Sequence, residues 1–315
     1  MALIGQGKEI RDIHSLLVVR NGYLVLEEYF HGWQADRLHM QQSVTKSFTS
    51  ALVGIAIDRG HIREVDEKVL AFFPGIKVKN LDDRKRAMGL EDLLTMRSGN
   101  DYREGYTGSP HSTLNSMATG WDRFILDRPM VREPGTMFQY DSGAPILTSS
   151  ILKNRAGVHA DDYARQHLFQ PLGIKQVEWF SNDEGHPHTG GGLDLLPRDM
   201  AKFGLLYLRG GRWQDAQVIP EDWIKESFRR HVSFTGRGHT IGYGYWWWIS
   251  EPDPAGAGKE PIFSARGFRA QYIFVVPEHD MVVVVTGGTR QWADEKKPVD
   301  FLYSHILPAV HRPSP

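Results

Sequence analysis

The sequence predicts an α+β fold of the α/β sandwich type, in which helices flank an antiparallel β-sheet built from both chain ends. A β-rich run on each side of Asn21-Gly22 indicates one hairpin, and two Val-rich runs near the other end indicate a second. Between the hairpins, helical spacing and Gly/Pro-rich loops predict a mostly helical insert. We expect residues 1–80 plus 235–315 to form the α/β domain and 81–234 the insert, with the functional site at their junction.

The first hairpin lies in residues 15–30, which read SLLVVRNGYLVLEEYF. Asn-Gly tolerates positive φ at both central positions of a type I′ turn, which is the turn that suits a two-residue hairpin. The second hairpin pairs YIFVV (272–276) with MVVVVT (281–286), whose continuous apolar run is typical of a strand buried on both faces. We expect the two hairpins to share one sheet.

Helical segments complete the prediction. PVDFLYSHILPAV (298–310) has one apolar stripe and is expected to pack on the sheet, with Pro308 ending the helix. The length of 315 residues allows about two domains or one large one, with a sizeable hydrophobic core. The insert is predicted to contain helices at 90–96, 144–157, 161–169 and 198–211.

Composition excludes several classes of function. The 37 Lys and Arg against 38 Asp and Glu leave a net charge of −1, so no broad positive field attracts nucleic acid or anionic lipid. The absence of Cys excludes a thiol nucleophile and Cys-ligated zinc. No apolar stretch approaches the 18 or so residues that span a bilayer, and the N-terminus has no signal-peptide pattern. We expect a soluble protein without a metal or cofactor, cytoplasmic or the mature form of an exported protein.

A Ser–Lys pair is the first candidate for chemistry. The segment from Ser43 to Gly60 has the apolar spacing of a helix that begins around Ser43. Three residues along a helix place Cβ atoms about 5–6 Å apart on one face, so Lys46 reaches back to the Ser43 hydroxyl. The positive end of the helix dipole favours negative charge at the same place. A capping serine and a surface lysine would give the same letters, so the pair alone is weak evidence.

Tyr140 strengthens the case. Tyr140-Asp141-Ser142 follows PGTMFQ (134–139), a loop-like stretch that leads into the helix predicted from Ala144. A tyrosine in such a loop can face a cleft, although a packed aromatic with its hydroxyl bound to a carbonyl is the alternative.

Together these residues resemble the serine hydrolases of the β-lactamase and penicillin-binding-protein superfamily, nearest its class C, esterase and aminohexanoate-dimer hydrolase branches. The resemblance covers most of the chain and implies a Ser nucleophile and Lys in S-x-x-K and a Tyr in Y-x-N or Y-x-S, here Ser43, Lys46 and Tyr140. It rests on six segments in the family's order: SVTKSFTSALVGIAIDRG, LEDLLTMRSG, PGTMFQYDSG, TGGGLDLLPRDMAKFGLLYLRGG, IGYGYWWW and FSARGFRAQYIFVVPEHDMVVVV.

The family's third motif, usually K-T-G or H-x-G on a strand that lines the cleft, has two candidates. His188-Thr189-Gly190 matches by letters but lies in a Gly-rich stretch that favours a flexible loop. Ala265-Arg266-Gly267 lacks the basic first residue but leads into the C-terminal hairpin, and we prefer it. With that choice the oxyanion hole consists of the backbone N–H groups of Ser43 and Phe268.

The resemblance implies hydrolysis of a small-molecule ester or amide through an acyl-enzyme on Ser43. Either Lys46 or Tyr140 is the general base, and the residues leave that choice open. Because Ala265 cannot hold a substrate carboxylate, we expect weak or absent β-lactamase activity. A D-Ala-D-Ala peptidase or β-lactamase, or a penicillin-binding-like module without turnover, are the alternatives. Substrate-binding candidates are Ser142, Arg266, Gly267, Arg269, His188 and Trp179.

Overall fold

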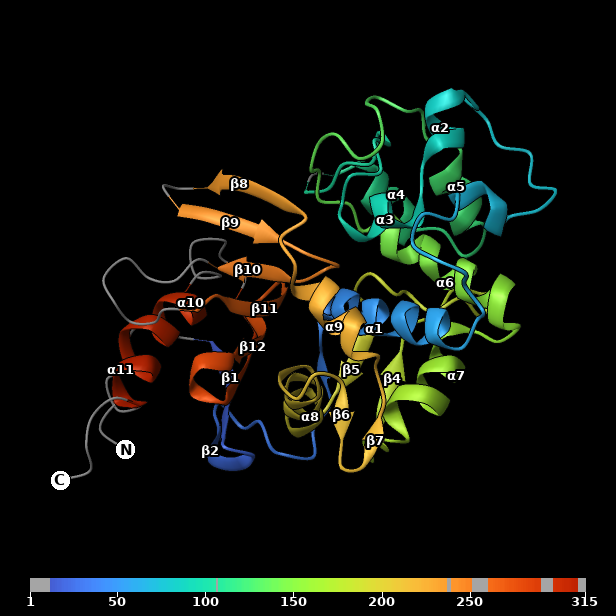
Figure 1. The fold of residues 1–315 in the computed structure, drawn as a ribbon. Helices are drawn as coiled ribbons and strands as arrows, with labels where there is room; N and C mark the ends of the chain where they lie inside the picture. Colours follow the sequence, from blue (N-terminus) through green and yellow to red (C-terminus); the bar gives the residue numbers. More distant parts are fainter. Residues whose placement is uncertain (1–11, 106, 237–238, 251–259, 290–296, 311–315) are drawn as a thin grey trace.

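The computed structural model describes residues 12–105, 107–236, 239–250, 260–289 and 297–310. An eight-stranded antiparallel sheet has the strand order β2-β1-β13-β12-β11-β10-β9-β8, so strands from both chain ends lie side by side (Figure 1). This confirms the predicted fold class. The strands of this sheet are β1 (Ile13–Arg20), β2 (Tyr23–Tyr29), β8 (Val232–Gly236), β9 (His239–Tyr243), β10 (Trp248–Ser250), β11 (Ile262–Gly267), β12 (Gln271–Val276) and β13 (Met281–Gly287).

Both predicted hairpins are confirmed. Asn21 and Gly22 adopt φ of 52° and 79° between β1 and β2, as a type I′ turn requires. All seven residues of β13 are buried, because α8 covers one face of the sheet and the C-terminal helices cover the other. β1 pairs with β13, which joins the two hairpins in one sheet.

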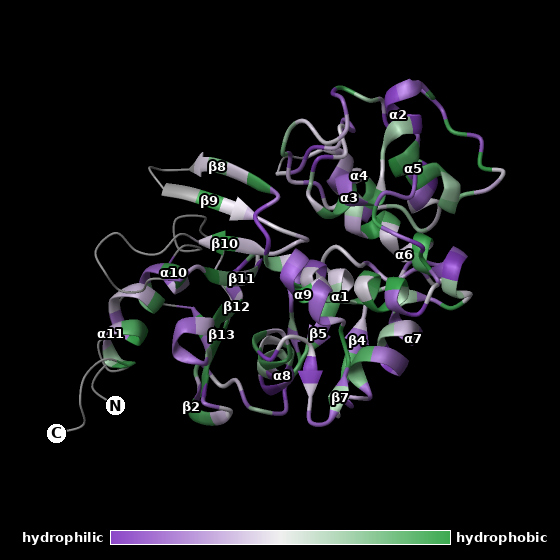
Figure 2. Cartoon of the chain, in the orientation of Figure 1, coloured by the Kyte–Doolittle hydropathy of each residue, from purple (hydrophilic) through white to green (hydrophobic). Residues whose placement is uncertain are grey.

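The C-terminal segment packs on the sheet as predicted, but it does not end at Pro308. It consists of α10 (Lys297–Phe301), a π-helical turn η6 (Leu302–Ile306) and α11 (Leu307–Val310), which continues through the proline. The wider turn before Pro308 changes the hydrogen-bond pattern that a proline ring would interrupt in a regular helix. In Figure 2 this segment shows both green and purple, as expected of a helix with one apolar face on the sheet.

The middle of the chain is mainly helical. All four helices predicted there are present, as α3, α6, α7 with η3, and α8. The elements between β2 and β8 are β3 (His39–Met40), η1 (Gln42–Val44), α1 (Thr45–Asp58), η2 (Val69–Phe72), α2 (Asp83–Ala87), α3 (Leu90–Leu94), α4 (Pro110–Asn115), α5 (Trp121–Leu126), α6 (Gly143–Ala156), α7 (Ala160–Ala164), η3 (Arg165–Phe169), β4 (Val177–Trp179), β5 (Leu193–Leu195), α8 (Pro197–Leu208), β6 (Arg212–Trp213), β7 (Ala216–Gln217) and α9 (Glu221–Phe228); η4 (Pro277–His279) joins β12 to β13.

The helix α8 packs on the sheet although it lies in the segment predicted as insert. A Cβ at Gly204 would come within 2.8 Å of Val282 and Ile273, so the glycine lets the helix approach β12 and β13 closely. The division at residues 80 and 235 stays a prediction. No helix of the described segments is long and apolar enough to cross a bilayer.

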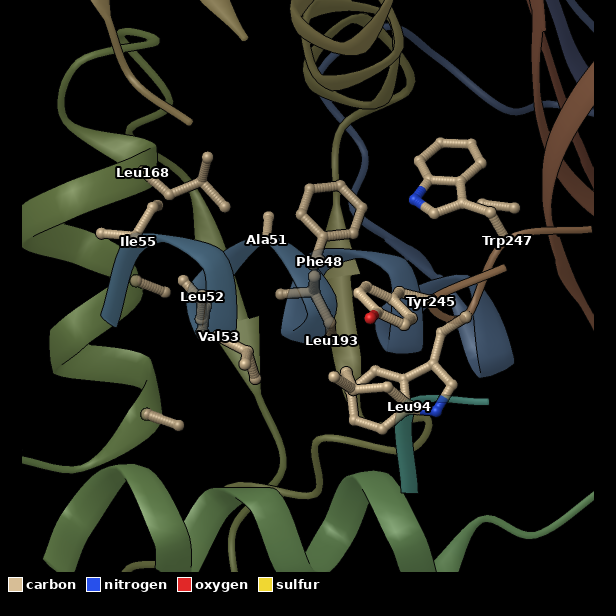
Figure 3. Packing of buried hydrophobic residues seen from close by; sticks show 14 of the residues in the cluster. Phe48, Ala51, Leu52, Val53, Ile55, Leu94, Leu168, Leu193, Tyr245 and Trp247 are labelled. Atoms are coloured by element: carbon tan, nitrogen blue, oxygen red, sulfur yellow. The ribbon is translucent and has the colours of Figure 1, made fainter. Parts of the chain in front are cut away.

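The helix α1 occupies the centre of the molecule. Residues 45 to 56 are all buried, with apolar contacts on every side of the helix, and Figure 3 shows Phe48, Leu52 and Ile55 among their neighbours. A helix surrounded by protein in this way holds its first turn rigidly. Lys46 lies in that turn, and Ser43 lies in η1 directly before it.

Candidate active site

The structure brings Ser43 and Lys46 together at the start of α1. Ser43 lies in the turn η1, immediately before the helix, and Gln42 beside it has φ of 49°, a conformation that costs energy for a residue other than glycine. The Lys46 ammonium donates hydrogen bonds to Ser43 Oγ at 2.8 Å and to the Gly190 carbonyl at 2.7 Å. The helix proper begins at Thr45, two residues later than predicted, yet the i, i+3 contact forms.

The environment of Lys46 favours its neutral form. The side chain is 1% exposed, and burial lowers its pKa to about 8 against the opposing effect of the carboxylates of Glu104 and Asp141. An amine with this pKa is partly unprotonated near neutral pH, so it can accept a proton.

Tyr140 lies beside the lysine. Lys46 Nζ is 4.9 Å from the centre of the Tyr140 ring, and this ring stacks on Trp248 with 5.9 Å between the ring centres. Burial and the charge of Glu104 raise the Tyr140 pKa, while a side-chain hydrogen bond with Ser43 opposes this rise. Tyr140 is therefore protonated near neutral pH and can donate its hydroxyl proton.

Asp141 and Ser142 are held firmly next to the tyrosine. Asp141 accepts hydrogen bonds from the N–H groups of Gly143 at 2.7 Å and Ala144 at 3.2 Å and from the Ser98 hydroxyl at 3.1 Å. Burial, with the charge of Glu104, raises the pKa of Asp141 to about 7. The Ser142 N–H donates to the Glu104 carboxylate. These contacts fix the loop that presents Tyr140.

Both candidates for the third motif lie beside the Ser–Lys pair. On one side, a Cβ at Gly267 would be 2.4 Å from the Gln41 carbonyl oxygen, so glycine permits β11 to lie directly against η1. On the other side, the Gly190 carbonyl accepts the Lys46 hydrogen bond described above. Ala265 is fully buried in the core next to α1.

The Arg266 guanidinium lines the cavity but is bound to protein groups. Its Nε donates to Ser264 Oγ at 2.8 Å and its Nη2 to Ser250 Oγ at 2.9 Å, and its Cζ lies 5.3 Å from the Trp248 ring centre. Arg269 is not among the described residues that line the cavity, and its Cζ lies 5.7 Å from the Phe268 ring centre.

His188 and Trp179 form another part of the cavity wall. His188 is buried, which lowers its pKa to about 3 and keeps it neutral, and its Nε2 is 3.1 Å from Asn115 Oδ1. The Trp179 indole donates to the His188 carbonyl at 3.2 Å. The stretch predicted to be a flexible loop is thus packed against the site, because Gly190 and Gly192 leave room for Ser142 and His188.

One cavity of about 1050 Å³ joins these residues. Of the predicted site residues it is lined by Ser43, Tyr140, Ser142, Trp179, His188, Arg266, Gly267 and Phe268. Sequence reasoning missed Glu104, His111, Asn115 and Trp248, which also line it. Glu104 lies in the loop before α4, and His111 lies in α4 itself. The spacing of the polar residues in this segment is the same as that of solvated residues, so no local signal in the sequence marked these two.

Comparison with known proteins shows to which family the chain belongs. The Beta-lactamase family model matches residues 6–301. A 6-aminohexanoate-dimer hydrolase from Paenarthrobacter ureafaciens is 23% identical over 94% of this chain and 79% of its own length.

Two solved structures share the fold. EstCE1, described as a hydrolase with promiscuous acyltransferase activity, has a TM-score of 0.78 at 16% identity, covering 99% of this chain and 96% of its own. A D-stereospecific amidohydrolase from Streptomyces sp. has a TM-score of 0.74 at 15% identity, covering 97% and 98%. Ser43 lines the cavity, and Lys46, a buried residue of α1, is hydrogen-bonded to it. The match along nearly the whole chain places this protein in the β-lactamase family of hydrolases.

Proposed function

We propose that this protein is a serine hydrolase that cleaves a small ester or amide through an acyl-enzyme on Ser43. The observation that carries the proposal is the 2.8 Å contact between Ser43 Oγ and the buried Lys46 amine, whose pKa is lowered to about 8. A serine hydroxyl is a weak nucleophile unless a base adjoins it, and Lys46 is such a base.

Lys46 is the better general base of the two open choices, because burial lowers its pKa and raises that of Tyr140. In its neutral form the Lys46 amine accepts the hydroxyl proton of Ser43 as Oγ bonds to the substrate carbonyl carbon. The carbonyl oxygen becomes an oxyanion, which the N–H groups of Ser43 and Phe268 stabilise.

Tyr140 completes the proton transfer. When the tetrahedral intermediate collapses, the bond to the leaving oxygen or nitrogen breaks and that atom takes the Tyr140 hydroxyl proton, which the Lys46 ammonium replaces. Both residues then have their starting protonation. Water attacks the acyl carbon while the Lys46 amine takes its proton. The Lys46 ammonium then gives that proton to Ser43 Oγ as the bond between Oγ and the acyl carbon breaks, so an acid is released and the enzyme is regenerated.

Esters and amides are favoured over β-lactams as substrates. Ala265 has no charge for a substrate carboxylate, and Arg266 is bound to Ser264 and Ser250. The names of three relatives, a 6-aminohexanoate-dimer hydrolase, a hydrolase with promiscuous acyltransferase activity and a D-stereospecific amidohydrolase, support the same substrate class.

The test is covalent labelling with a fluorophosphonate, read by intact mass, together with hydrolysis of short-chain p-nitrophenyl esters and linear amides. We expect one adduct on the parent protein and loss of about 10⁴-fold or more in kcat for Ser43→Ala. Ser50→Ala, the same change at a buried position of α1, is the control and is expected to retain activity. Full activity of Ser43→Ala would disprove the assignment.

A further inference from the structure

The turn between β11 and β12 is strained where it carries a proposed oxyanion-hole donor. Phe268 begins this turn, and the next two residues, Arg269 and Ala270, have φ of 64° and 65°. Neither is a glycine, and a residue of this kind in the left-handed region is strained, so the surrounding structure has to hold the turn in place.

The Gln271 side chain supplies that hold. It is 1% exposed, and its amide nitrogen lies within hydrogen-bond distance of three main-chain carbonyls: Phe268 at 3.3 Å, Arg269 at 2.8 Å and Gly287 at 2.7 Å. Its amide oxygen accepts the Gly287 N–H at 3.4 Å. One buried side chain therefore ties two carbonyls of the turn to the end of β13.

Gln271 also lies opposite the tight contact at the nucleophile. It is the β12 partner of Gly267 in the sheet, and a Cβ at Gly267 would be 3.1 Å from the Gln271 Cβ and 2.4 Å from the Gln41 carbonyl. A shift of Gln271 is thus transmitted to the Gly267–Phe268 peptide, whose N–H is the proposed donor, and to its spacing from η1.

We infer that Gln271 is a positioning residue that orients the Phe268 N–H towards the substrate oxyanion by holding the strained turn. This inference rests on the proposed function. It extends that function to Gln271, which is not among the described residues that line the cavity. Because a misplacement of about 1 Å in a catalytic group costs on the order of 100-fold in rate, losing the hold is expected to affect turnover more than substrate binding.

The experiment replaces Gln271 with Leu and, separately, with Met, which fills a similar length without hydrogen bonds. Each variant is assayed for kcat and KM with a p-nitrophenyl ester and for inhibition by a boronic acid that forms a tetrahedral adduct on serine. We expect kcat and the boronate affinity to fall together by about 10- to 100-fold while KM changes less than threefold.

Two further variants separate positioning from general stability. Gln217→Leu is the matched control, since the Gln217 amide also donates to two main-chain carbonyls, at 2.8 and 2.6 Å, outside the cavity; it is expected to lower the melting temperature but not kcat. Ala270→Gly favours the positive φ of the turn and is expected to leave the parent activity unchanged and to restore at least part of the activity of Gln271→Leu.

The outcomes are distinguishable. If a folded Gln271→Leu or Gln271→Met protein keeps kcat and boronate affinity within twofold of the parent, the inference is overturned while the proposed function stands. If one of the two variants fails to fold, the comparison is made with the other, with the same result required. If the parent protein takes no fluorophosphonate and hydrolyses no ester or amide, the proposed function itself fails.

Discussion

The lowered pKa of Lys46 predicts the pH dependence of the reaction. With a pKa of about 8, the neutral amine is about 1% of the population at pH 6, about 9% at pH 7 and about 90% at pH 9. If Lys46 is the base, kcat/KM for an uncharged ester rises about 90-fold from pH 6 to pH 9, with a slope near one in its lower part. A fully exposed lysine would place the same rise about two units higher.

A substitution of Glu104 tests this pH dependence by changing the pKa of Lys46. Its negative charge raises the Lys46 pKa, so Glu104→Gln is expected to move the inflection to lower pH, and the amide oxygen can still accept the Ser142 N–H. Glu178→Gln is the matched control, because Glu178 lines the same cavity but does not contribute to the Lys46 shift.

The assay is kcat/KM for a short-chain p-nitrophenyl ester between pH 5.5 and 10, with the folded fraction checked at each pH. An inflection near pH 6 or above pH 10, or one that Glu104→Gln leaves in place, would refute Lys46 as the base.

Three further outcomes are expected. Because Ala265 is uncharged and Arg266 is bound to two serines, nitrocefin and penicillins are expected to be poorer substrates than p-nitrophenyl esters; a 100-fold preference for the β-lactams would contradict this. Gly267→Ala places a methyl group 2.4 Å from the Gln41 carbonyl, so we expect a loss of about 1–3 kcal/mol in denaturant unfolding and lower kcat, and an unchanged variant would show that β11 does not lie against η1. Burial lowers the pKa of His188 to about 3, so below pH 6.5 this histidine binds a proton in the unfolded protein but not in the folded one, and the free energy of unfolding decreases as the pH falls. His188→Gln is expected to remove about 2 kcal/mol of the decrease between pH 7.5 and pH 5. An equal decrease in both proteins would contradict this.

Local sequence patterns predicted which helices and strands form more accurately than they predicted where these elements end. Asn21-Gly22 determined one hairpin through a backbone requirement that few dipeptides meet, and the Val-rich runs determined the other. The C-terminal helix was predicted, yet its continuation through Pro308 was not, because that depends on the wider turn before it.

The Ser–Lys contact was predictable because it lies within one helical turn. The remainder of the site comes from distant segments: Gly190 meets Lys46 across 144 residues, and Glu104 reaches the Ser142 N–H across 38. No single-sequence pattern specifies such contacts, which follow from how the sheet and helices pack. The resemblance to a family identified Tyr140, and spacing alone did not.

The sheet made from both chain ends also sets the order in which the protein matures. The Ser15 and Thr286 hydroxyls meet at 2.7 Å across 271 residues, and β11, which lies against η1, pairs with β12. A nascent chain that already contains Ser43, Lys46 and Tyr140 still lacks β11 and the turn that carries Phe268. Such distant pairing is slow to form, so the proposed activity is expected only after both chain ends have paired in the sheet.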